Sequence, residues 1–347
     1  MRLEKPKAEL RRGWTTGACA TAATKAAATA LVTGKFPDPV TIRLPKGETP
    51  TFPLALAEIG EGWAKAGIVK DAGDDPDVTH GCTVIAAVRR GLEGIRFKAG
   101  EGVGTVTKPG LPVAVGAPAI NPKPREMMLA VLAELGIVGA DVEISIPGGQ
   151  ALASKTWNPR LGIEGGLSIL GTTGIVHPFS CAAWIASIHR GVDVARAGGL
   201  PHIAGCTGST SEDAVRTKFG LPLEAMIDMG DFAGGLLTYV RSHPVQRLTI
   251  GGGFGKITKL AQGAMDLHSG RSQVDFEKLA CLAPPALKPK IAAANTALEA
   301  LDLAGEGLAK DVAALALAEM REKLRGAPVV ADVVIVGRDG AVLAHAT

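Results

Sequence analysis

Apolar and polar positions follow two different rhythms along this chain, and the change falls near residue 160. Before that point the apolar runs are short and separated by turns, which is typical of strands. These runs are Val40–Leu44, Thr51–Ala57, Trp63–Val69, Thr83–Arg89, Ile95–Ala99 and Asp141–Ile146. Two helices are predicted among them, over the alanine-rich Ala18–Leu31 and over Arg125–Leu135. The sequence therefore predicts a mixed α+β domain over residues 1–160.

After residue 160 the strand-like runs alternate with helical segments. The predicted strands are Leu167–Leu170, Pro201–Ala204, Ala225–Ile227, Arg247–Ile250, Val329–Val336 and Ala341–Ala344. The predicted helices include Phe179–Ala197, Ser211–Phe219, Gly235–Ser242, Ile291–Leu303 and Leu308–Leu324. Strands that alternate with helices usually form a parallel sheet that the helices cover. The pattern therefore predicts an α/β, Rossmann-like domain with a mostly parallel sheet over residues 161–347.

Turns of small or acidic residues follow four of these strands. The turns are Gly171-Thr172-Thr173-Gly174, Gly205-Cys206-Thr207-Gly208, Asp228-Met229-Gly230-Asp231 and Gly251-Gly252-Gly253-Phe254-Gly255-Lys256. In open α/β sheets the ligand crevice lies beyond the carboxyl ends of the strands, so these turns predict a bound cofactor. The residues predicted to contact it are Gly171, Thr172, Thr173, Gly174, Gly205, Thr207, Gly208 and Asp231.

The first of these turns belongs to the stretch Gly165–Ser180, which we interpret as a strand, a glycine turn and the start of a helix. This geometry presents backbone N–H groups to an anionic or polar ligand. The spacing is Gly-x-x-Gly rather than the full dinucleotide fingerprint, so an ordinary strand-to-helix turn remains the alternative.

An acidic loop, Lys70–Gly81, contains four aspartates and one histidine. Its spacing does not match a calcium-binding EF-hand, because no glutamate closes it at position 12. Two other interpretations stay open. The loop is either a solvated turn in which Asp side chains cap their own backbone, or an ordered site loop in which Asp74, Asp75 or His80 meets a ligand. A metal site ranks last.

Two more stretches are weaker signals. Thr15 or Thr16 is a plausible N-cap for the helix over Ala18–Leu31, and the start of that helix could attract an anion. The glycine-rich Gly100–Leu111 ends in Lys-Pro-Gly, which does not fit a phosphate-binding P-loop.

Composition narrows the class of protein. The net charge is only +3, aromatic residues make up 4%, and no dense basic run occurs, so a nucleic-acid partner is not expected. Five dispersed cysteines support neither a disulfide framework nor a zinc site, and reduced thiols in a cytoplasmic protein fit better. Residues 1–12 lack an apolar signal segment, and no apolar run is long enough to cross a membrane.

Several unusual blocks resemble one family over nearly the whole chain. They are Arg12-Gly13-Trp14-Thr15-Thr16-Gly17, the acidic loop Lys70–Gly81, Gly102–Leu111, Ala119-Ile120-Asn121-Pro122, Ile169–Val176, Gly253-Phe254-Gly255-Lys256 and His268-Ser269. The chain is similar in these blocks to the cobalt-precorrin-5B C(1)-methyltransferases, the CbiD family of cobalamin biosynthesis. Two blocks depart from the usual pattern. Gly205-Cys206-Thr207-Gly208 replaces Gly-Asn-x-Gly, and Asp266-Leu267-His268-Ser269 replaces Asn-Thr-His-Ser.

The resemblance implies methyl transfer from S-adenosyl-L-methionine to C-1 of cobalt-precorrin-5B or precorrin-5B, an anionic tetrapyrrole. The residues hypothesised to hold this substrate are Thr16, Lys108, Arg125, Arg160, Lys256 and Lys259, five of them cations that could clamp its carboxylates. Displacement at a sulfonium methyl depends more on alignment than on a strong base. Candidates for a base are Asp75, His80 and Asp231, and Asp231 could instead hold the cofactor.

Two other functions remain open from sequence. The α/β half would suit a nicotinamide-dependent oxidoreductase, although no Gly-x-Gly-x-x-Gly opens it. A tetrapyrrole-binding carrier would use the cations and need no cofactor crevice. The sequence does not fix the oligomeric state, and a homo-oligomer is one possibility.

Overall fold

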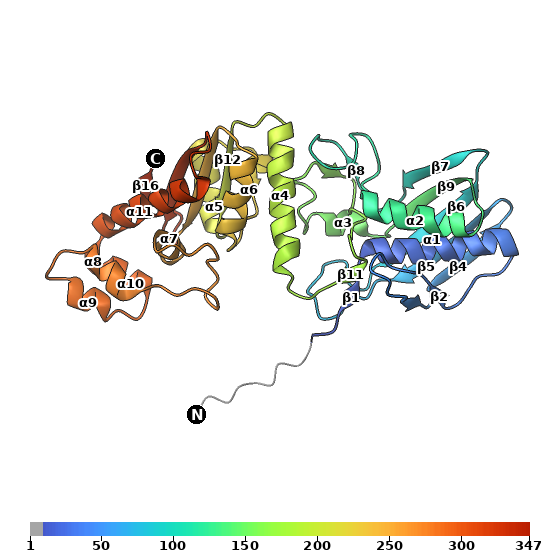
Figure 1. The fold of residues 1–347 in the computed structure, drawn as a ribbon, viewed down its shortest axis with the longest axis horizontal. Helices are drawn as coiled ribbons and strands as arrows, with labels where there is room; N and C mark the ends of the chain where they lie inside the picture. The colour runs from blue at the N-terminus through green and yellow to red at the C-terminus, as the bar shows by residue number, and fades with distance from the viewer. Residues whose placement is uncertain (1–9) are drawn as a thin grey trace, which may run out of the picture. The chain divides into compact units, whose positions relative to one another are not determined.

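The computed structural model describes residues 10–347, which divide into two compact units after Ser180 (Figure 1). The division lies beyond residue 160 because the next segment pairs with the first unit. Strand β10 (Ile163–Glu164) pairs with β8 (Thr105–Val106), and β11 (Ile175–Val176) pairs with β1 (Gly13–Trp14). Within residues 10–347 no helix is long and apolar enough to span a membrane.

The first unit is built on a five-stranded sheet in the order β4-β5-β6-β9-β7. Its strands are β4 (Leu56–Gly60), β5 (Trp63–Val69), β6 (Thr83–Arg90), β9 (Gly139–Ser145) and β7 (Gly94–Ala99). All neighbours are antiparallel except β7 and β9. Helices α1 (Thr16–Thr33) and α2 (Pro122–Glu134) pack on the sheet, and the smaller elements are β2 (Val40–Thr41), β3 (Thr51–Phe52) and α3 (Gly149–Ala153).

Helix α1 forms the centre of this unit, and its prediction is confirmed. Thr15 is the N-cap, with its side chain accepting a hydrogen bond from the Ala18 N–H, and Gly34 ends the helix in the left-handed conformation. Alanines at positions 18 to 28 are fully buried on several sides of the helix. Their small side chains let the sheet and α2 approach the helix axis closely.

The second unit holds a sheet in the order β13-β12-β14-β15-β16, in which only β16 is antiparallel. Its strands are β12 (His202–Cys206), β13 (Met226–Ile227), β14 (Arg247–Gly253), β15 (Val330–Val336) and β16 (Val342–Ala346). Its helices are α4 (Cys181–Ala197), α5 (Ser209–Phe219), α6 (Ala233–Ser242), α7 (Phe254–Ala261), α8 (Phe276–Cys281), α9 (Lys288–Ala292), α10 (Ala297–Ala304) and α11 (Glu306–Leu324). The prediction of a mostly parallel sheet with covering helices is confirmed for this unit.

The helices cover both faces of that sheet. Ala204 and Val334 belong to a cluster with residues of α5, whereas Ile203 and Val333 belong to the large core formed with α6, α7 and α11. Because adjacent residues of a strand point to opposite faces, α5 covers one face and the other helices cover the opposite one.

Three predicted elements are wrong. Thr51–Ala57 is not one strand, because Thr51–Phe52 is β3, which pairs with β2, and β4 of the five-stranded sheet begins at Leu56. Leu167–Leu170 is not a strand of the parallel sheet, since it lies in the first unit, where Leu167 and Ile169 form single bridges to Val103 and Ile120. The predicted helix Ile291–Leu303 is two helices, α9 and α10. The break occurs because the Thr296 side chain accepts from the Glu299 N–H and caps a new helix.

Candidate functional site

The carboxyl edge of the second-unit sheet brings together two of the glycine-containing turns. The chain leaves β12 for α5 on one face and leaves β14 for α7 on the other. The two strand ends are in contact, because the Thr207 N–H donates to the Gly251 carbonyl at 3.0 Å. A Cβ at Gly252 would lie 2.8 Å from the Thr207 hydroxyl oxygen, so the glycine makes room for the Thr207 side chain at this point.

The two glycines that frame the β12 turn have different surroundings. A Cβ at Gly205 would lie 2.5 Å from the Leu236 side chain and 3.0 Å from Met229, so this glycine permits core packing. A Cβ at Gly208 would meet nothing within 4 Å, and the same is true of Gly253 at the end of β14. Open space therefore adjoins Gly208 and Gly253 rather than Gly205.

Asp231, Lys256 and Lys259 come together beside this edge. The Lys256 ammonium pairs with the Asp231 carboxylate, and the Leu267 N–H donates to the Asp231 carbonyl at 2.8 Å. Lys259 is buried and donates to the Leu267 carbonyl at 3.1 Å. Burial, with a contribution from Lys256, lowers the pKa of Lys259. Both predicted substrate cations thus bind the protein's own groups: Lys256 holds Asp231, and Lys259 holds the segment at Leu267.

The turn after β13 also contacts an aromatic side chain. The Trp184 indole N–H donates to the Asp228 carbonyl at 3.0 Å, and a Cβ at Gly230 would lie 3.0 Å from the indole ring. Sequence reasoning did not single out Trp184. The sequence around Trp184 does not indicate a contact with this turn, because the contact depends on where β13 ends in space.

The turn Gly171–Gly174 lies in the first unit, so its predicted placement at the edge of the parallel sheet is wrong. It folds against the start of α1, where the Thr15 N–H donates to the Gly174 carbonyl and the Leu170 N–H donates to the Thr16 hydroxyl, both at 3.0 Å. Thr172 is exposed.

Little space remains around the rest of that turn. A Cβ at Gly171 would collide with Thr15, and one at Gly174 would lie 2.5 Å from Leu44. The Thr173 hydroxyl accepts from the Ile175 N–H at 3.2 Å. These contacts give the turn a packing role at the start of α1.

The acidic loop is ordered by hydrogen bonds that its own aspartates accept. Arg11 binds the Asp71 carboxylate with two nitrogens, one of them at 2.9 Å, and its N–H donates to Asp74 at 2.6 Å. The hydrogen bond from Arg11 lowers the pKa of Asp71 to about 2. The Asp75 carboxylate accepts from the Phe179 N–H at 2.8 Å. Asp71 and Asp77 also cap their own backbone, since they accept from the Gly73 N–H at 2.9 Å and the Thr79 N–H at 2.7 Å. These bonds agree with the interpretation of a turn whose aspartates cap their own backbone, and they form without any ligand.

His80 is held in one hydrogen-bonding role. Its Nδ1 accepts from the Ala72 N–H at 3.1 Å, so in the neutral ring the proton resides on Nε2. The side chain is 54% exposed. With the Nδ1 lone pair already used, His80 in this tautomer can donate from Nε2 to a ligand.

A buried lysine closes the base of the loop. Lys70 is 1% exposed and its ammonium donates to Asp77 at 2.6 Å, while Asp77 also accepts from the Thr79 N–H and hydroxyl. Burial raises the pKa of the neighbouring Cys19 thiol to about 12. Sequence reasoning missed Lys70, although a lysine that opens an acidic loop is a candidate partner for one of its aspartates.

The other predicted substrate cations of the first unit are partly buried. Arg125 donates to the carbonyls of Ile120 at 2.8 Å and Pro118 at 3.0 Å and lies over the Phe97 ring, and burial lowers its pKa. The stem of Lys108 packs on the Gly162 backbone, where a Cβ would lie 2.5 Å from it. Arg160 is half-buried in the turn that follows Trp157.

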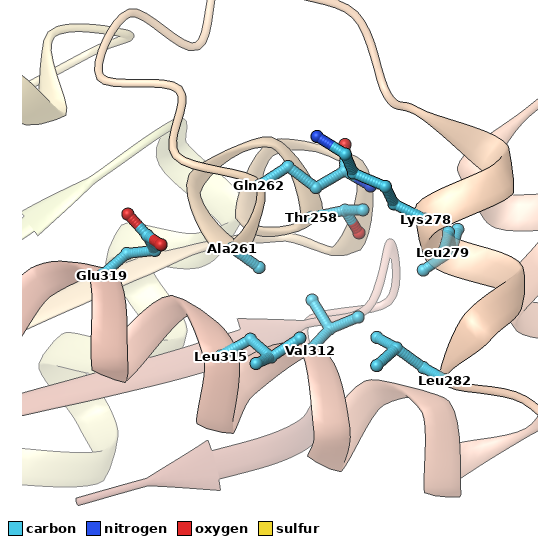
Figure 2. A pocket seen from close by; sticks show the side chains of 9 residues that line it. All are labelled: Thr258, Ala261, Gln262, Lys278, Leu279, Leu282, Val312, Leu315 and Glu319. Atoms are coloured by element: carbon cyan, nitrogen blue, oxygen red, sulfur yellow. The ribbon is translucent and has the colours of Figure 1, made fainter.

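A cavity of about 260 Å³ lies between α7, α8 and α11 in the second unit (Figure 2). Leu279, Leu282, Val312 and Leu315 make its wall apolar, while Gln262, Lys278 and Glu319 supply polar groups. None of the predicted site residues lines it. Across residues 10–347, no three His, Cys, Asp or Glu side chains are grouped so that they could hold a metal ion.

By its fold the chain is a mixed α/β protein, in which one five-stranded sheet is mainly antiparallel and the other mainly parallel. Comparison with known families is more specific. The chain belongs to the CbiD family, since the CbiD model matches residues 3–178 and the model of the CbiD C-terminal domain matches residues 266–347.

Curated relatives cover nearly the entire chain. A protein of Brucella anthropi named cobalt-precorrin-5B C(1)-methyltransferase is 60% identical over 98% of this chain and 96% of its own length. One of the same name from Paramagnetospirillum magneticum is 61% identical, over 97% of this chain and 98% of its own. A solved structure, cobalamin biosynthesis protein (cbiD) from Archaeoglobus fulgidus, is 30% identical over 76% of this chain and 83% of its own, with a TM-score of 0.40.

Proposed function

We propose that the chain is a C-methyltransferase that transfers the methyl group of S-adenosyl-L-methionine to C-1 of cobalt-precorrin-5B during cobalamin biosynthesis. The observation that carries this proposal is the 60% identity, over 98% of the chain, to a relative that bears this activity as its name. The motif blocks of both halves of the chain fall within that match.

We propose that the second unit is a Rossmann-like domain that binds the methyl donor. Two features support this placement. The strand order 2-1-3-4-5, counted along the chain, puts a topological switch point between β12 and β14, which is where open α/β sheets bind ligands. Gly208 and Gly253 stand at the ends of these strands and leave open space, and Thr207 joins the two strand ends through its N–H on the Gly251 carbonyl. Lys256, which follows β14, holds Asp231, which follows β13.

The chemistry requires that a macrocycle carbon attack the sulfonium methyl in line, forming a C–C bond as the S–C bond breaks and S-adenosylhomocysteine leaves. The protein's task is to align the two partners and to accept the proton that the macrocycle loses. We assign that acceptor role to a carboxylate, Asp75 or Asp231. His80 is better suited to donate a hydrogen bond from Nε2 to an oxygen of the substrate.

The substrate residues divide into two groups under this proposal. Lys108 and Arg160 are the cations that we propose to meet carboxylates of the macrocycle. Arg125 instead holds the backbone at Pro118 and Ile120, and Thr16 holds Leu170, so both act through the fold. Lys256 and Lys259 support Asp231 and the segment at Leu267.

The first experiment is calorimetric titration with S-adenosylhomocysteine, with NADH as the parallel control. Binding of S-adenosylhomocysteine alone is the expected result and leads to a labelled-methyl assay with the macrocycle. Binding of NADH alone would overturn the proposal in favour of an oxidoreductase. The activity itself would be refuted if the methyl donor and cobalt-precorrin-5B both bind but no labelled methyl group is transferred to the macrocycle.

A further inference from the structure

We propose that Asp228 binds the ribose hydroxyls of the methyl donor. This inference rests on the proposed function and deepens it, because it assigns a recognition group to one part of the donor. Asp228 directly follows β13, and its side chain is partly exposed. The argument has two independent parts: the strand register and the spacing along the chain.

The register places Asp228 beside the β12 turn. Strands β12 and β13 are parallel neighbours in which Gly205 is opposite Ile227. The next residue of each strand, Cys206 and Asp228, therefore reaches the carboxyl edge together. A ligand in the open space at Gly208 would have this acid on the adjoining strand end.

The spacing also fits nucleoside recognition. In nucleotide-binding βαβ units an acidic residue at the end of the second strand, about 20 residues beyond the glycine turn, accepts hydrogen bonds from the ribose. Asp228 follows Gly208 by 20 positions, with α5 between them. The missing Gly-x-Gly-x-x-Gly does not oppose this assignment, since those glycines let the backbone approach a pyrophosphate and this donor has none.

The second acid of this turn, Asp231, is bound within the protein. Its carboxylate pairs with Lys256 and its carbonyl accepts from the Leu267 N–H at 2.8 Å. The Asp228 carbonyl accepts from the indole N–H of Trp184 at 3.0 Å, so Trp184 is a positioning residue for the backbone of the turn that carries Asp228.

The two aspartates make a matched pair for the test. Wild type, Asp228→Asn and Asp231→Asn are each titrated with S-adenosylhomocysteine and with its 2′-deoxy analogue. A carboxylate that binds the ribose makes wild type prefer the intact nucleoside by about 10- to 100-fold, the range expected for hydrogen bonds to a charged group. We expect Asp228→Asn to bring this ratio close to one and Asp231→Asn to preserve it.

Each result is decisive in one direction. A normal preference in Asp228→Asn would overturn the assignment while leaving the proposed function intact, and loss of the preference only in Asp231→Asn would transfer the role to that residue. Failure of wild type to bind S-adenosylhomocysteine would overturn the proposed function instead. If Asp228→Asn does not fold, as judged by circular dichroism, Asp228→Ser provides the same comparison with a smaller polar side chain.

Discussion

Two turns with the same Gly-x-x-Gly spacing have opposite surroundings in this molecule. Gly171–Gly174 in the first unit is closed by Thr15 and Leu44, whereas Gly208 at the end of the second turn borders open space. The Gly-x-x-Gly spacing therefore indicates only that another group approaches the backbone of the turn closely. Whether that neighbour is the protein itself or a ligand depends on the elements to which the turn connects.

The largest expected effect tests the closed turn. Gly171 has φ +133° and its Cβ would collide with Thr15, so Gly171→Ala combines backbone strain with overpacking and should lower the free energy of unfolding by about 3 kcal/mol or more. Urea denaturation measures it. The control is Gly165→Ala, which also has positive φ but no neighbour within 4 Å and should cost about 1–2 kcal/mol. Equal losses in the two variants would show that Thr15 does not close the turn.

A second prediction compares a lysine–aspartate pair from each unit. Lys70→Met leaves Asp77 without its buried partner and should cost about 2–4 kcal/mol, somewhat below the usual range because Asp77 is 25% exposed. Lys256→Met removes the partner of Asp231. The acids left behind are similarly exposed in the two pairs, at 25% and 19%, so the difference rests on the lysines: Lys70 is 1% exposed and Lys256 is 33% exposed. Solvent screens the Lys256 pair more, and its loss should be about 1 kcal/mol. Thermal or urea unfolding of both variants gives the comparison, and a reversed order would contradict it.

A third prediction tests the open turn. Gly208 has an extended backbone that any residue can adopt, so Gly208→Val should fold and lose only about 1 kcal/mol as a poorer N-cap. Its side chain would fill the space proposed for the donor and weaken S-adenosylhomocysteine binding at least about tenfold, which is about 1.4 kcal/mol. Gly208→Ala should weaken it less. Unchanged affinity in the folded valine variant would remove the donor from this turn.

The smallest effect concerns acid. Because Arg11 lowers the pKa of Asp71 from 3.8 to about 2, this carboxylate stabilises the fold fully above about pH 4, and its contribution is lost as the pH falls toward 2. Solvent screening keeps the contribution small. Urea midpoints of wild type and Asp71→Asn should differ at pH 6 and converge near pH 2. A difference that grows on acidification would refute the assignment.

Local signals predicted much of the fold. Alanine content, the Thr15 cap and Gly34 were enough to define α1, and the alternation after residue 200 was enough to indicate the parallel sheet. Leu167–Leu170 misled because an apolar run of four residues suits a single bridge as well as a strand. Asn295 and Thr296 are residue types that often cap helices, so the break between α9 and α10 was predictable. The apolar pattern continues on both sides of them, which is why one helix was predicted.

The site was less predictable, because its contacts join distant parts of the chain. The Asp231–Lys256 pair forms only when the ends of β13 and β14 lie on either side of β12. Arg125 has a guanidinium group that could bind a substrate carboxylate, which is why the sequence suggested that role. In the structure it binds two carbonyls of the loop before α2, and no short motif predicts the conformation of that loop. Substituting Gly174 would likewise report on packing against Leu44 rather than on a cofactor.

Helix α1 has a consequence for how mutational data on this family should be interpreted. Its alanines from 18 to 28 are fully buried, so nearly any larger residue there would force the sheet or α2 away. In a deep mutational scan α1 would therefore be a continuous block of intolerant positions, similar in appearance to a catalytic segment. Measuring protein abundance and activity separately for each variant would identify α1 as a structural element. Its small side chains set the distance between α2 and the sheet of the first unit.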